Sequence, residues 1–129
     1  MRLSHAMGAC LLLLGACSGA VQQTGRSPSS ESVITAADLE GQPAGNLFDY
    51  IVSHRPRWLE RAYSPALLHD VPETAVYIDN TEYGGPEILR QVLLTSIAEV
   101  RHYSPSEAQM RFGPGHLNGV IQITTRAGR

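Results

Sequence analysis

The chain has 129 residues, of which 43% are hydrophobic and 17% are charged, and its formal net charge at pH 7 is −2. A chain of this length has room for one small hydrophobic core and not for two. Its charge balance excludes the strongly basic surface with which nucleic-acid-binding proteins hold phosphates, so we expect no nucleic-acid partner.

Residues 1–16 have the order of a secretory signal. Arg2 supplies the positive start, an apolar stretch runs from Ala6 to Gly15, and small residues close the segment. The stretch is too short for a permanent membrane helix, which needs about 20 apolar residues. Gly15-Ala16 directly before Cys17 resembles a bacterial lipobox, in which the protease cuts before a lipid-modified cysteine. We therefore expect a lipoprotein signal peptide over 1–16 and a lipid anchor on Cys17, whereas an ordinary signal cut elsewhere would leave Cys17 incidental.

The mature chain would hold a single thiol. Cys10 lies within the apolar stretch and would be removed with the signal, so Cys17 would have no disulfide partner. Without Arg2, nine arginines stand against twelve acidic residues, which gives a mature charge of −3. Ser18 rather than Asp follows the cysteine, and this favours sorting to the outer membrane, with the domain facing the periplasm. Acyl chains on the cysteine would give durable anchoring.

A tether and two short helices are expected next. Residues 17–33 are the lipidated N-terminus and a polar, aperiodic stretch that predicts a flexible tether, and residues 34–129 are the expected domain. The spacing from Thr35 to Asp38 is that of a capping box and predicts a short helical turn that ends at Gly41. Residues 44–54 then carry the apolar stripe of an amphipathic helix, at Leu47, Phe48, Ile51 and Val52.

Pro56 disfavours helical geometry at the residue before it and ends this helix. Arg55-Pro56-Arg57-Trp58 has the residue types of an interface hot spot. We interpret it as a loop in which Trp58 closes the core while both arginines stay solvated.

A hairpin and a second helix are predicted in the middle of the chain. Ala75–Asp79 is β-prone, Asn80-Thr81 is a plausible turn, and Glu82-Tyr83 returns toward Gly84-Gly85. Pro86 suits the first turn of a helix. Its predicted apolar stripe consists of Ile88, Leu89, Val92 and Leu93.

Strands and helices continue to alternate toward the C-terminus. Capping-box spacing over Ser96–Glu99 leads into a predicted strand at Val100–Tyr103, and the same spacing over Ser106–Gln109 fits one or two helical turns. Gly119–Thr125 is the clearest strand, with Ile121 and Ile123 on one face. The chain therefore predicts a small α+β domain with short strands in a mixed sheet and short helices.

The motifs of this second half follow a recognisable order. A Val76-Tyr77-Ile78-Asp79 strand precedes a glycine pair and a short helix, residues 97–113 follow, and Asn118–Arg126 closes the series. This order resembles the VYVDG, DIERIEVLRGPSAALYG and GGVINITTK segments of the plug domain of TonB-dependent outer-membrane receptors. Those receptors continue into a β-barrel, whereas this sequence stops at Arg129. The resemblance thus implies a stand-alone plug-like domain.

The resemblance also implies a binding role. Plug loops that contact substrate correspond to the segments around Tyr83, Gly84 and Gly85 and around Arg111 and Phe112. We expect a non-enzymatic interaction or accessory module at the outer membrane, whose partner is an outer-membrane barrel or a periplasmic protein. A small-ligand-binding lipoprotein that uses the same loops is the alternative.

A metal-assisted periplasmic hydrolase is a further alternative. His69-Asp70 could act as a base with an orienting carboxylate, and Asp79, Glu82 and Glu87 could bind a cation. No pair of mature histidines has the i, i+4 spacing of a helical metal site, and a calcium loop needs a denser series of oxygen ligands. We therefore expect no catalytic residue, no metal and no cofactor.

Overall fold

The computed structural model describes residues 31–60 and 73–128, which form one mixed sheet with short helices. The sheet has five strands in the order β1-β4-β5-β2-β3, where β2 and β5 run parallel and the other neighbouring pairs are antiparallel. The strands are β1 Val33–Thr35, β2 Ala75–Ile78, β3 Thr81–Gly84, β4 Ile97–Tyr103 and β5 Val120–Thr125. The predicted α+β class with a mixed sheet is confirmed. Cys17, His69 and Asp70 lie outside the described residues.

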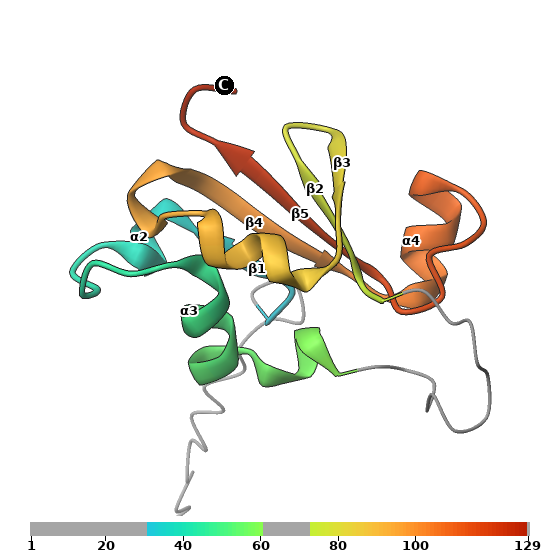
Figure 1. Cartoon of the computed structure of the whole chain (residues 1–129), viewed down its shortest axis with the longest axis horizontal. Helices are drawn as coiled ribbons and strands as arrows, with labels where there is room; N and C mark the ends of the chain where they lie inside the picture. Colours follow the sequence, from blue (N-terminus) through green and yellow to red (C-terminus); the bar gives the residue numbers. More distant parts are fainter. Residues whose placement is uncertain (1–30, 61–72, 129) are drawn as a thin grey trace, which may run out of the picture.

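Most of the helices lie against one face of the sheet, and α4 lies beyond one end of it (Figure 1). The helices are α2 Ala36–Leu39, α3 Leu47–His54 and α4 Pro105–Phe112, with 3₁₀ turns η1 Pro56–Leu59, η2 Pro86–Gln91 and η3 Leu94–Ser96. Within the described ranges, no helix is both long and apolar enough to cross a membrane.

The hydrophobic core fills the space between the sheet and α3, η1 and η2. Side chains alternate across a strand, so the cross-strand partners Val76, Ile121 and His102 share one face and Tyr77, Gln122 and Arg101 share the other. The core consists of Ile34, Leu39, Leu47, Ile51, Trp58, Val76, Leu89, Val92, Leu94, Ile97, Val100, Ile121 and Ile123. Ile121 and Ile123 thus share the buried face, as predicted.

The first two predicted helices form, with corrected limits. Asp38 Oδ2 accepts hydrogen bonds from the amide and hydroxyl of Thr35 at 2.8 and 2.7 Å, so the predicted capping box is confirmed. The second helix begins at Leu47 rather than at residue 44, because Asn46 caps it by accepting a hydrogen bond from the Asp49 amide at 3.0 Å.

Trp58 closes the core as predicted. It is only 4% exposed and stacks on His102, with 5.2 Å between the ring centroids. Arg57 is exposed, but Arg55 is half-buried and its Nε has no hydrogen-bond partner within the part of the chain that the structure describes. The prediction that both arginines stay solvated is therefore correct for Arg57 only.

Three local predictions in the second half are corrected. The hairpin turn consists of Asp79 and Asn80, both with positive φ, rather than Asn80-Thr81. The capping-box spacing over residues 96–99 starts no helix, because Ile97 already pairs with Thr125 in β4. Ser104 rather than Ser106 caps α4: its hydroxyl donates to Glu107 at 2.6 Å, and Pro105 occupies the first helical position.

Candidate functional site

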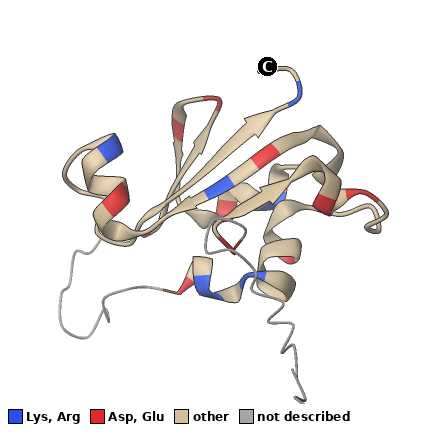
Figure 2. Cartoon of the chain, turned by 180° about the vertical axis from the view of Figure 1, so that it is seen from behind, with Lys and Arg blue, Asp and Glu red and all other residues tan. Residues whose placement is uncertain are grey.

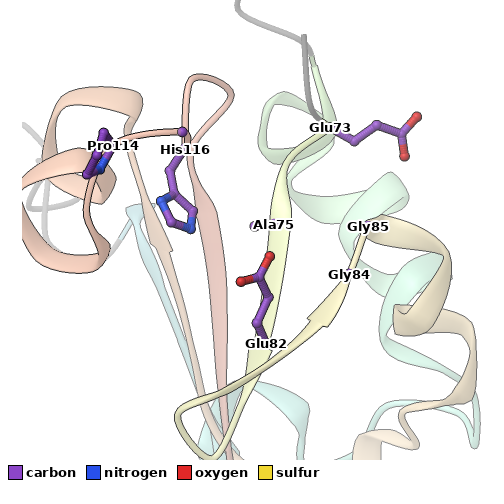
Figure 3. A pocket seen from close by; sticks show the side chains of 8 residues that line it. Glu73, Ala75, Glu82, Gly84, Gly85, Pro114 and His116 are labelled. Carbon is purple, nitrogen blue, oxygen red and sulfur yellow. The ribbon is translucent and has the colours of Figure 1, made fainter. Parts of the chain in front are cut away.

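The predicted glycine loop forms one wall of a cleft on the sheet face that faces away from the core. On one side Gly84 ends β3 and Gly85 follows it, and residues 114–116, which precede β5, lie on the other side (Figure 3). The cleft has a volume of about 490 Å³. Its lining is Glu73, Ala75, Glu82, Gly84, Gly85, Pro114, Gly115 and His116.

This sheet face carries polar and aromatic side chains rather than a second layer of helices. Seen from behind, the strands lie in view with α4 at one end, and acidic and basic residues are both scattered over the molecule (Figure 2). Tyr77, Tyr103 and Gln122 lie on this face. The Tyr103 hydroxyl donates to Gln122 Oε1 at 3.2 Å, and Gln122 Nε2 donates to Asn80 Oδ1 at 2.7 Å. A hydrogen-bonded row thus crosses the sheet beside the cleft.

A second hydrogen-bonded row spans the cleft itself. The Tyr77 hydroxyl lies 3.1 Å from Glu82 Oε2 and 3.1 Å from His116 Nε2, and His116 Nδ1 lies 2.9 Å from the Gly113 carbonyl oxygen. The pKa of Tyr77 is raised. The main cause of this raised pKa is partial burial of the hydroxyl, and the hydrogen bond to Glu82 and the negative charge of Glu82 add to it. The β2–β3 hairpin is thereby joined to the loop after α4.

The protons of this row are limited in number. His116 Nδ1 must carry a proton to bond the Gly113 carbonyl, and the Tyr77 hydroxyl has one proton to give. If that proton goes to ionised Glu82, the contact with His116 Nε2 is a hydrogen bond only when Nε2 is protonated as well. The Tyr77 hydroxyl can therefore donate to Glu82 or to His116, and not to both at once.

The second predicted loop lies next to the cleft and not in its lining. The Phe112 ring packs 4.6 Å from the Tyr77 ring and 5.4 Å from the Tyr103 ring, measured between centroids. The Arg111 guanidinium lies over the Tyr103 ring at 5.2 Å. Tyr83 is 56% exposed on β3, beside the two glycines. The structure thus brings Gly84 and Gly85 into the cleft and assigns Phe112 to an aromatic cluster at its edge.

The acidic residues considered for a cation site have separate partners. Asp79 accepts hydrogen bonds from the amide and hydroxyl of Thr125 at 2.8 and 2.6 Å, and these bonds lower its pKa. Glu87 pairs with Arg90 at 3.0 Å, and Glu82 bonds Tyr77. Across residues 31–60 and 73–128, no three His, Cys, Asp or Glu side chains gather as metal ligands.

Sequence reasoning missed His116 in the cleft and Tyr77, to which it is hydrogen-bonded. Tyr77 was predicted only as a strand residue, although its place between the apolar residues Val76 and Ile78 could have assigned it to the opposite face. His116 lies 39 residues later in the chain and carries no local signal. No family model, no curated protein and no solved structure matches this chain.

Proposed function

We propose that this chain is a non-enzymatic envelope lipoprotein in which Cys17 holds a plug-like interaction domain at the periplasmic face of the outer membrane. The lipobox before Cys17 supports the anchor, and the ordered motifs of residues 75–126 support the plug-like character. The partner is an outer-membrane barrel or a periplasmic protein.

One observation carries the binding role: an open cleft adjoins an exposed edge strand. All four residues of β3 are exposed, and the last of them, Gly84, lines the cleft. The volume of about 490 Å³ lies within the range of roughly 300–1,000 Å³ in which proteins bind ligand groups. The cleft's polar groups Glu82 and His116 are held in place by hydrogen bonds to the Tyr77 hydroxyl. A site with fixed polar groups and an open mouth suits recognition of a partner's side chain.

Site-specific photo-cross-linking in intact cells tests this function. A photoreactive residue at Tyr83 samples the exposed edge strand β3 beside the cleft, and one at Val52 on α3 is the matched control, because the two residues are 56% and 48% exposed. We expect a reproducible envelope protein to be joined at position 83 and absent at position 52. Identical background products at both positions would contradict an interaction through the cleft side.

A further inference from the structure

The outer edge of β3 presents backbone groups that no strand of the described sheet pairs with. β3 stands last in the strand order, next to β2 alone. The turn before it has positive φ at both Asp79 and Asn80, which is the geometry of a two-residue type I′ hairpin. In such a hairpin the closing pair, here Ile78 and Thr81, exchanges hydrogen bonds and the next pair does not. Since Glu82 belongs to that next pair, its N–H and C=O point outward.

The edge is only partly protected against pairing. Natural proteins protect edge strands with short length, charged side chains, prolines, β-bulges or a covering element; Thr81–Gly84 contains neither lysine nor proline, but it is short and carries Glu82. A bulge follows at Tyr83, because Val76 pairs with Gly84 and Tyr77 pairs with Glu82. At Glu82, therefore, both the backbone N–H and the backbone C=O are available to an incoming strand, and the side chain lies beside them.

The charge around Glu82 selects the kind of strand that fits. Its carboxylate points into the cleft, whereas the Glu73 side chain extends away from Glu82, with its carboxylate near Gly85 (Figure 3). Among residues 31–60 and 73–128, the cleft lining includes no Arg or Lys. Opposite charges directly across two strands stabilise their pairing, by roughly 0.2–1 kcal/mol, and like charges destabilise it. An incoming residue opposite Glu82 is therefore favoured when it is basic.

The same rule disfavours a second copy of this chain as the occupant. Antiparallel self-pairing through the outward groups of Glu82 would place the two Glu82 carboxylates directly opposite each other. A partner segment with a basic residue avoids that repulsion. Gly84 and Gly85, which follow Tyr83 and line the cleft with Glu82, add no side chain to hinder an incoming one.

We propose that β3 binds an extended segment of a partner protein as a sixth strand, with an arginine or lysine of that segment paired to Glu82 at the mouth of the cleft. The inference rests on the proposed function and names the partner's binding segment. Backbone hydrogen bonds would supply affinity, and the Glu82 pair would supply the choice of sequence.

The test uses the full mature chain with Cys17→Ser, which keeps it in solution, and a seven-residue peptide of alternating Thr and Val with one central Arg. Fluorescence anisotropy gives the affinity, and hydrogen exchange reports the Glu82 amide. We expect slower exchange at Glu82 on binding and about fivefold weaker binding when the central Arg is replaced by Glu. Glu82→Gln should remove most of that preference. Glu99→Gln, on the same sheet face but paired with Arg101 at 3.2 Å, should keep it.

Glu82→Pro provides a second, independent variant. It removes the outward N–H without removing a β2–β3 hydrogen bond, so it should abolish peptide binding while amide spectra show an intact hairpin. Unchanged exchange at Glu82 with saturating peptide, or equal affinity for the Arg and Glu peptides, would overturn the proposal. Protection at Glu82 in a dimer without peptide would assign the edge to a second copy. If cross-links at Tyr83 recur while the peptide fails, strand addition is wrong and the interaction module stands.

Discussion

At the scale of single residues, Asp79 shows how one carboxylate fixes the relation between two strands. It lies in the β2–β3 turn and accepts two hydrogen bonds from Thr125 at the end of β5. Asp79→Asn keeps a side chain that tolerates the left-handed backbone but loses the charge that strengthens both bonds. We expect a lower urea midpoint for the variant at pH 7.

The pH dependence of that difference follows from the lowered pKa of Asp79. A carboxyl whose pKa is lower in the folded state stabilises the fold above its unfolded pKa, here near 3.8, and loses this contribution as the pH falls through the folded pKa. Urea unfolding from pH 7 to pH 2 should thus show a constant gap that closes below about pH 3.8. Glu40→Gln, at an exposed site outside the sheet, is the control. A gap that persists unchanged to pH 2 would contradict this role.

At the scale of elements, the start of β5 depends on Gly119. Its φ is +83°, and a Cβ there would lie 2.5 Å from the Tyr103 carbonyl oxygen. Gly119→Ala therefore combines left-handed strain of about 1–2 kcal/mol with a backbone clash, and we expect a loss of at least about 2 kcal/mol in the free energy of unfolding. Gly45→Ala is the matched control, because the nearest atom to its Cβ would be the Pro43 oxygen at 3.8 Å. Equal urea midpoints for the two variants would show that the backbone at Gly119, where β5 begins, does not require glycine.

The apolar stripes of the helices were predictable only in part. Leu47 and Ile51 are fully buried as predicted, but Val52 is 48% exposed because the next position along an α-helix turns about 100° away from the sheet. The helix predicted from Pro86 is the 3₁₀ helix η2, which has about three residues per turn. Leu89 and the C-cap Val92 are therefore buried together, whereas Leu93 is 60% exposed. Apolar spacing alone does not distinguish the two helix types.

At the scale of the whole molecule, the sheet topology creates what the sequence could not predict. The glycine pair, the hairpin and the strand at Gly119–Thr125 follow from local patterns, so one wall of the cleft was predictable. The opposite wall exists because parallel pairing places Tyr77 beside Gln122, and the chain between α4 and β5 then brings His116 to the Tyr77 hydroxyl. Contacts across 39 residues depend on strand order, which no local motif specifies.

The predicted location of the protein at the outer membrane depends on one residue, Cys17. Cys17 is the only thiol of the predicted mature chain, and the described domain begins fourteen residues later, at Glu31. Cys17→Ser should abolish palmitate labelling and outer-membrane retention, because the serine hydroxyl cannot receive the diacylglycerol thioether. Cys10→Ser is the matched control: it changes the other cysteine, which lies in the apolar part of the signal, and should keep both properties.

A second variant carries residues 18–129 behind an ordinary cleavable signal. It is needed because a Cys17→Ser protein that keeps its uncleaved signal would be held at a membrane by that signal. This form should reach the periplasm and stay in the soluble fraction after osmotic release, because it lacks the cysteine that the acyl chains would modify. If it still sediments with outer membranes, the domain itself binds there, and the lipid is not what retains it. Repeating the fractionation with Glu82→Pro then separates the two explanations: retention through β3 would be lost in that variant, and retention through lipid headgroups would not.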